Sequence, residues 1–172
     1  GNDTLVGGAG ADTTIDGGVG ADTLTGGTGD DNFVNTYGQG VSATALIDAT
    51  TGLAMAGTVT LAVGDSITFG NGVDIITDFT AGGTTDDLNT LTSGAATSAL
   101  GIAHDTLAGA DDIQFLSGAF NTANNTFTIS ANGAGADTMI IDIDQSATAN
   151  IDASLGITIL QGVDSDNLVA AD

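Results

Sequence analysis

Aspartates recur among glycines at a fixed spacing in the first 34 residues. Four successive segments share the pattern: GNDTLV (1–6), GGAGADTTID (7–16), GGVGADTLT (17–25) and GGTGDDNFV (26–34). The last two fit the nine-residue pattern G-G-x-G-x-D-x-U-x at every fixed position, where U is a large apolar residue. Carboxylates and backbone carbonyls are the ligands that Ca²⁺ prefers, and it takes about six to eight such oxygens. The repeat therefore predicts calcium binding.

Each repeat divides into a turn and a very short strand. Glycine tolerates positive φ, so the G-G-x-G-x-D half can turn sharply and direct several carbonyls at one point. The x-U-x half is a strand whose apolar side chain points inward. Such repeats are typical of a parallel β-roll. One coil of a roll takes two repeats, so we expect Asp3 to stack on Asp22 and Asp12 to stack on Asp31.

The second repeat is one residue too long. Between Asp12 and Gly17 it reads T-T-I-D, where the third repeat has only T-L-T. We expect a local bulge at this point, with Ile15 taking the inward role that the large apolar residue has in the other repeats, namely Leu5, Leu24 and Phe33.

The net charge also indicates a need for cations. All 22 acidic residues are Asp, and the chain has no Lys or Arg, which gives a formal charge of −22. Two carboxylates about 6 Å apart repel by roughly 3 kcal/mol at an effective dielectric constant near 20, whereas native domains are stable by only about 5–15 kcal/mol. Hydrophobic residues make up 41% of the chain, enough for a core. We therefore expect a folded protein that depends on bound cations.

Composition excludes several classes of function. Without a basic patch, nucleic-acid binding is not expected. No run of about 18 apolar residues is present, so no membrane insertion is expected. Cysteine is absent, which excludes disulfides and zinc–thiolate sites. His104 is the single histidine, and neither G-x-S-x-G nor H-E-x-x-H occurs. We expect a protein that is not an enzyme.

The middle of the chain is less regular. We expect a loop over 35–56 with one strand around 45–48, a hairpin of 58–63 and 66–69 joined by Gly64-Asp65, and a short helix near 88–100. Residues 71–79 predict a buried strand flanked by Asp74 and Asp78. These two aspartates are candidates for a further calcium site, the alternative being solvated carboxylates at the strand ends.

The last third alternates with a period of two, which predicts strands with one buried face. The alternating residues are Ile113 and Phe115, Phe127 and Ile129, Met139, Ile141 and Ile143, and Ile157 and Ile159. Asn124-Asn125 predicts a turn before the Phe127 strand. The chain as a whole predicts an all-β protein, with a short calcium-loaded parallel β-roll over 1–36 and a β-sheet or sandwich-like region over 37–172.

The repeats resemble the RTX family of bacterial proteins exported by type I secretion. The segment G-V-D-I-I-T-D-F (72–79) is similar to the D-x-I-x-D-F segment that follows RTX arrays, and N-G-A-G-A-D-T-M-I (132–140) is similar to a repeat. The sequence I-T-I-L-Q-G-V (157–163) resembles the C-terminal end of type I secreted proteins.

The resemblance implies two calcium sites between stacked loops. One would use Gly1, Asp3, Gly17, Val19 and Asp22. The other would use Gly8, Gly10, Asp12, Gly26, Thr28 and Asp31. A half-site of Gly18, Gly20 and Asp22 faces downstream, where N-T-Y-G-Q-G (35–40) holds no matching loop.

These observations lead to one expected function and one alternative. We expect a calcium-binding structural module of an extracellular bacterial surface protein, of the surface-layer or adhesin type, that folds on calcium binding after type I secretion. Its expected partners are the secretion machinery and copies of itself, bridged by calcium. The alternative is the C-terminal folding and secretion domain of an RTX exoenzyme, a protease or lipase, whose catalytic domain lies upstream.

Overall fold

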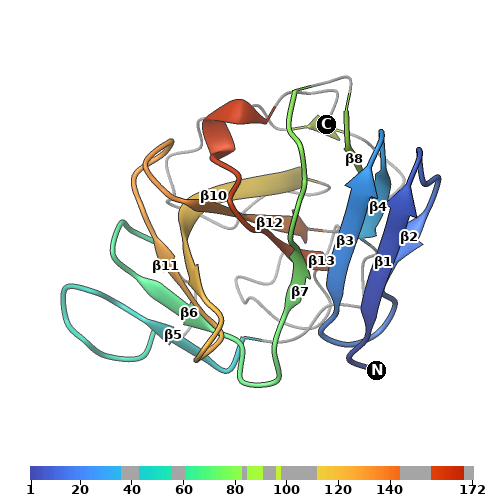
Figure 1. Cartoon of the computed structure of the whole chain (residues 1–172). Coiled ribbons are helices and arrows are strands. Elements are labelled where there is room, and N and C mark those ends of the chain that lie inside the picture. The colour runs from blue at the N-terminus through green and yellow to red at the C-terminus, as the bar shows by residue number, and fades with distance from the viewer. Residues whose placement is uncertain are drawn as a thin grey trace.

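A computed structural model shows an all-β fold, as the sequence predicts. It describes residues 1–35, 43–55, 61–82, 85–90, 96–97, 112–143 and 156–168. Two sheets form within these ranges (Figure 1). In spatial order, the larger sheet contains β1 (Thr4–Ala9), β3 (Thr23–Thr28), β7 (Asp74–Ile76), β13 (Gly156–Leu160), β12 (Asp137–Ile143), β10 (Asp112–Asn121), β11 (Thr126–Ile129), β6 (Ser66–Thr68) and β5 (Ala45–Ile47), and β9 (Ala96–Thr97) also pairs with β10.

The smaller sheet has three strands, and a 3₁₀ turn lies near the C-terminal end of the described chain. The strands are β2 (Ile15–Asp16), β4 (Asn32–Asn35) and β8 (Asp87–Thr90), and the turn is η1 (Ser165–Asn167). Among the described residues, no helix has the length and apolar character needed to cross a membrane.

Three rungs build the amino-terminal roll, each with one strand in each sheet. Rung 1 is β1 and β2, rung 2 is β3 and β4, and rung 3 is β7 and β8. All pairings between successive rungs are parallel. Figure 1 shows the blue strands of rungs 1 and 2 side by side. β1 and β3 have six residues each and include the first two glycines of the following repeat, whereas β2 has two residues and β4 has four.

The extra residue of the second repeat forms the expected local shift in register. Asp12 lies opposite Asp31, 19 residues on, but Ile15 lies opposite Phe33, only 18 residues on. The additional residue is therefore absorbed between Asp12 and Ile15. Ile15 keeps its inward place and is buried in the same cluster as Leu24 and Phe33.

Rung 3 comes from a distant part of the sequence. After β4, the chain runs through β5 and β6 before β7 pairs with β3, at a separation of 52 residues for Thr23 and Ile75. The other edge of β7 pairs with β13, so the larger sheet continues from the roll into the C-terminal strands. The division into 1–36 and 37–172 stays a prediction, but this sheet crosses the boundary.

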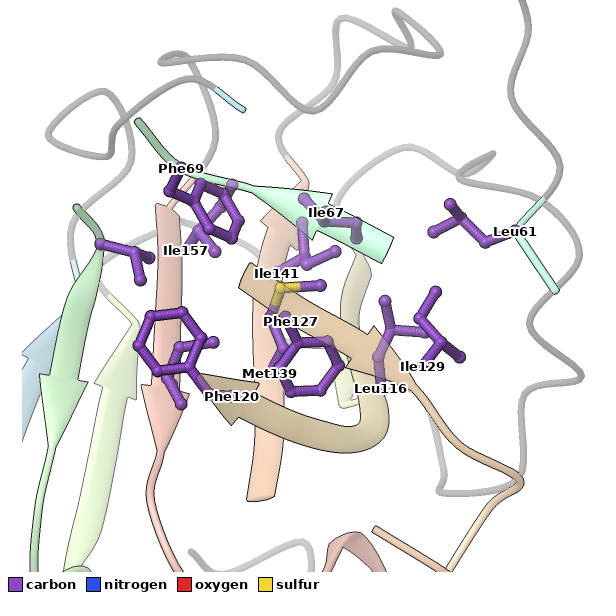
Figure 2. Packing of buried hydrophobic residues seen from close by; sticks show 12 residues of the cluster. Leu61, Ile67, Phe69, Leu116, Phe120, Phe127, Ile129, Met139, Ile141 and Ile157 are labelled. Carbon is purple, nitrogen blue, oxygen red and sulfur yellow. The ribbon is translucent and has the colours of Figure 1, made fainter. Parts of the chain in front are cut away.

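Two hydrophobic clusters cover the two faces of the larger sheet. Met139 and Ile141 belong to one cluster, and Ile140, which points to the opposite face, belongs to the other. The first cluster also joins Ile67 of β6 to Ile157 of β13, which are not neighbours in strand order, so the sheet curls around this cluster (Figure 2). The expectation of one buried face is wrong for β12 and β13, because the roll interior continues along their second face.

Several expected elements are confirmed. The strand around 45–48 is β5, the buried strand within 71–79 is β7, and the alternating runs of the last third are β10 to β13. The turn at Asn124-Asn125 is present, and Asn125 has a φ of 51°.

Two expectations are wrong where the structure describes them. Residues 61–63 do not pair with 66–69 as a hairpin, because both edges of β6 are already taken by β5 and β11. Instead, Leu61 is buried in the first cluster. The predicted helix near 88–100 is replaced by β8 and β9, because β8 extends the smaller sheet beside β4. Residues 91–95 and 98–100 lie outside the described ranges.

Candidate metal centre

The turns on one side of the roll place three aspartates in a column, which we call column A: Asp3, Asp22 and Asp74. The backbone N–H of Asp3 donates to Oδ1 of Asp22 at 2.6 Å. In the same way, the backbone N–H of Asp22 donates to Oδ1 of Asp74 at 2.8 Å. Each carboxylate thus holds the amide of the aspartate one rung earlier.

The turns on the other side form an equivalent column B: Asp12, Asp31 and Asp86. The backbone N–H of Asp12 donates to Oδ1 of Asp31 at 2.9 Å, and that of Asp31 donates to Oδ1 of Asp86 at 3.0 Å. The structure therefore brings together both pairs that the sequence predicts, Asp3 with Asp22 and Asp12 with Asp31. It adds a third aspartate to each column.

The glycine turns stack closely enough to place backbone carbonyls against the next rung. A Cβ on Gly27 would overlap the carbonyl oxygen of Gly8, and one on Gly29 would lie 2.5 Å from that of Gly10. Both receiving glycines have positive φ, 109° and 130°, which strains any side chain. The conformation and the close approach together explain why the repeat requires glycine at these positions.

Two carboxylate oxygens in these columns are buried without a hydrogen-bond partner. They are Oδ2 of Asp12 and Oδ2 of Asp22, and within the described ranges only the amide oxygen of Asn32 shares this state. Asp22 is 1% exposed. An unpartnered buried polar group costs about 1–3 kcal/mol, and a charged one costs more. A bound cation would remove this cost.

A carbonyl oxygen of the next rung lies on the same side of Gly7 as the oxygen of Asp12. A Cβ on Gly7 would overlap Oδ2 of Asp12 and lie 2.6 Å from the carbonyl oxygen of Gly26. Both oxygens therefore crowd Gly7, between rungs 1 and 2. A carboxylate and a carbonyl are the oxygens that Ca²⁺ prefers.

The remaining predicted residues lie in the same turns. The carbonyl of Val19 accepts from the Gly1 amine at 2.5 Å, and the carbonyl of Thr28 accepts from the N–H of Gly10 at 2.7 Å. The carbonyl oxygen of Gly1 lies against Gly20. The predicted ligand sets are thus assembled from stacked turns, and ligation by each of their residues stays a prediction.

Asp78 differs from the aspartates of the repeats. Its Oδ1 accepts from Gly26 N–H and its Oδ2 from Gly27 N–H, both at 2.9 Å. Asp86, which is 4% exposed, also uses both oxygens, for the N–H groups of Asp31 and Thr80. Backbone amides already satisfy these two carboxylates.

Sequence reasoning missed the loop that follows the half-site of Gly18, Gly20 and Asp22. The next loop is residues 70–74, where Gly72 has a φ of 89° and an added Cβ would lie 2.7 Å from Cβ of Ala21. The signal is present in the sequence, because F-G-N-G-V-D-I-I-T (69–77) matches the nine-residue pattern except at its first glycine. The expectation of no matching loop concerned only the adjacent residues 35–40, of which 36–40 lie outside the described ranges.

Burial raises the pKa of the Asp74 carboxyl to about 7, and the negative charges of Asp22 and Asp16 add to this rise. The hydrogen bond from the Asp22 N–H opposes it. No three carboxylate or imidazole side chains in the described ranges cluster tightly enough to hold a metal ion by themselves. The predicted sites need only two carboxylates each, with carbonyls as the other ligands.

The chain has a distant likeness to a known structure. No protein-family model matches the chain, and no curated protein matches it. Among solved structures, it is similar to the solution structure of the AlgE6R3 subunit from the Azotobacter vinelandii mannuronan C5-epimerase. Identity is 20%, the match covers 99% of this chain and 78% of that chain, and the TM-score is 0.41. The assignments below therefore depend on the residues of this chain alone.

Proposed function

We propose that the chain is a calcium-binding, non-enzymatic structural module of an extracellular bacterial surface protein, and that it folds on calcium binding. The observation that carries the proposal is the buried Oδ2 of Asp12, which has no hydrogen-bond partner and lies, like the carbonyl of Gly26, beside Gly7 between rungs 1 and 2. Asp31, which is 2% exposed, would supply the second carboxylate of this site.

Calcium would supply positive charge that the chain's Lys- and Arg-free sequence lacks. With −22 formal charge and neither Lys nor Arg, the carboxylates of columns A and B have no cationic side chain to pair with. When no cation is bound, repulsion between the carboxylates of each column favours the unfolded chain. An ion that binds only the folded state adds about 2.7 kcal/mol at a hundredfold excess over its dissociation constant. Two or more sites would suffice to switch a marginally stable roll.

Circular dichroism during a calcium chloride titration tests coupled folding. We expect little β structure in chelator and a cooperative gain of β signal as calcium is added. Magnesium chloride at the same ionic strength is the control, and it should not reproduce the gain, since Mg²⁺ demands near-octahedral geometry and dehydrates reluctantly. A fully ordered spectrum in chelator would contradict coupled folding.

The proposed setting is the bacterial cell surface, after export by type I secretion. Calcium is scarce inside cells and plentiful outside, so the chain would stay loose before export and fold afterwards. Copies of the module would associate through calcium, because lateral contact between such acidic surfaces requires cations. Within the described part of the chain, β1 is an edge strand of the larger sheet, and it carries Val6, which is 67% exposed.

Analytical ultracentrifugation with and without calcium tests association. Calcium-dependent growth into ordered assemblies is the expected result. A calcium-saturated chain that stays monomeric at all accessible concentrations would favour the alternative, a folding and secretion domain that follows the catalytic part of an RTX exoenzyme.

A further inference from the structure

The dipeptide Asn-Gly occurs twice in the chain, as Asn71-Gly72 and as Asn132-Gly133. An asparagine before glycine can lose its side-chain ammonia without an enzyme, because glycine has no Cβ to shield the backbone nitrogen that attacks the side chain. Both asparagines are exposed and lie in turns. Both glycines have positive φ, 89° and 66°. Residue type and exposure therefore do not separate the two pairs.

The first pair is held by contacts within the chain. The N–H of Gly72 donates to the carbonyl of Phe69 at 2.9 Å. An added Cβ on Gly72 would lie 2.7 Å from Cβ of Ala21, so this turn also packs against the roll. To react, the Gly72 nitrogen must give up its proton and approach the side chain of Asn71. The hydrogen bond and the packing both oppose that step.

The second pair has a free backbone nitrogen. The N–H of Ala134 donates to the carbonyl of Ala131 at 3.0 Å, which closes a turn around Asn132 and Gly133. Glycine with positive φ at the third position is typical of a type II turn, whose hydrogen bond does not use the N–H of that glycine. Within the described ranges, no hydrogen bond engages the N–H of Gly133.

The side chain of Asn132 is polarised by a residue from another part of the chain. The hydroxyl of Ser165, which is 1% exposed, donates to Oδ1 of Asn132 at 3.2 Å. This hydrogen bond draws electron density from Cγ and stabilises the negative charge that develops on Oδ1 when a nucleophile attacks. Ser165 belongs to η1, so the reactive arrangement needs both the turn and the docked 3₁₀ segment.

We propose that Asn132-Gly133 is a site of spontaneous deamidation in the folded chain, and that Asn71-Gly72 is protected. The backbone nitrogen of Gly133 attacks Cγ of Asn132 and closes a five-membered succinimide ring. Its proton passes through water to the side-chain nitrogen, which leaves as ammonia. A second water then opens the ring at either carbonyl, giving aspartate or isoaspartate. No electrons are transferred, and each event adds one negative charge.

The product changes the docking of the C-terminal segment. The new carboxylate lies beside η1, which already carries Asp164 at its N-cap and Asp166 within it. No Lys or Arg exists to offset the repulsion. Val163 and Leu168, on either side of η1, are buried in the same cluster as Phe33. Deamidation should therefore loosen the segment that closes this cluster.

Peptide mapping by mass spectrometry tests the proposal on the purified whole chain. The chain is incubated with calcium in mildly alkaline buffer, with circular dichroism to confirm that it stays folded. A protease that cuts before aspartate isolates the two pairs in peptides 112–136 and 65–73. We expect the Asn132 peptide to deamidate severalfold faster than the Asn71 peptide. In urea, where neither turn persists, the two rates should become similar.

Ser165→Ala removes the donor to Oδ1 and should slow conversion of Asn132 severalfold while leaving Asn71 unchanged. If this variant does not fold, the two rates in the parent chain decide. Conversion of Asn71 as fast as Asn132 in the folded chain would overturn the inference, and so would an Asn132 that converts in urea but stays intact when folded. Equal or faster conversion of Asn132 in a folded Ser165→Ala chain would overturn it as well.

Discussion

The carboxylate of Asp74 accepts the backbone N–H of Asp22, which precedes it by 52 residues. In the same way, the carboxylate of Asp22 accepts the backbone N–H of Asp3, which precedes it by 19 residues. One local geometry therefore serves both a contiguous repeat and a segment separated from it by β5 and β6. A distant piece of chain completes the roll because it offers the same glycine turn and the same aspartate.

Removing the charge of a column aspartate should weaken calcium binding without removing the hydrogen bond. Asp31→Asn keeps an acceptor for the N–H of Asp12, but it lowers the charge of the site between rungs 1 and 2. We expect the calcium midpoint of folding, followed by circular dichroism, to rise severalfold. Asp30→Asn is the matched control, because Asp30 is exposed and adjacent. Equal midpoints for the two variants would remove Asp31 as a ligand.

Filling the space at Gly7 should block the same site by sterics. Gly7→Ala places a methyl group against Oδ2 of Asp12 and the carbonyl of Gly26, and the backbone at Gly7 does not have the positive φ that would strain alanine. We expect at least one tight calcium to be lost in calorimetry. Tight binding unchanged in Gly7→Ala would mean that no ion uses this space.

Calcium-free chains should be more stable at mildly acidic than at neutral pH. Burial and neighbouring charges raise the pKa of Asp74 from 3.8 to about 7, so the folded state holds a proton that the unfolded state has lost. The free energy of unfolding therefore falls as pH rises from about 4 to about 7. Circular dichroism in calcium-stripped buffer at pH 5 and pH 7.5 measures this. More residual β signal is expected at pH 5, and Asp74→Asn should flatten the difference. A stronger β signal at pH 7.5 in the parent chain would contradict it.

Asp137 should stabilise the C-terminal strands independently of calcium. It is 7% exposed, and its two oxygens accept the N–H groups of Phe120 and Gly162, at 2.7 and 2.8 Å. Since hydrogen bonds to charged groups contribute about 1.5–3 kcal/mol each, Asp137→Ala should lower the free energy of unfolding by about 3 kcal/mol or more. Urea unfolding at saturating calcium measures this.

The matched comparison for Asp137 is the number of tight calcium ions. We expect calorimetry to give the same number for Asp137→Ala as for the parent chain, because both carboxylate oxygens already have donors. Loss of an ion would show that Asp137 belongs to a metal site rather than to the core.

The sequence by itself determined the roll and its register. A period of nine with glycine and aspartate at fixed places allows one kind of turn, so the pairing of Asp3 with Asp22, the inward place of Ile15 and the all-β class follow from local rules. The alternating runs of β10 to β13 follow from the same reasoning. The sequence also predicts the need for cations, since the chain has neither Lys nor Arg.

Only the tertiary structure decided which distant segment completes the roll and which aspartates still lack a partner. Asp22, Asp78 and Asp137 are all aspartates, so residue type alone does not distinguish them. They differ because amides from remote strands reach both oxygens of Asp78 and Asp137 but only one of Asp22. The position of β7 between β3 and β13, and the lack of pairing between residues 61–63 and 66–69, likewise depend on which strand edges remain free. Local sequence fixes turns, whereas edge pairing and burial are set by residues far along the chain.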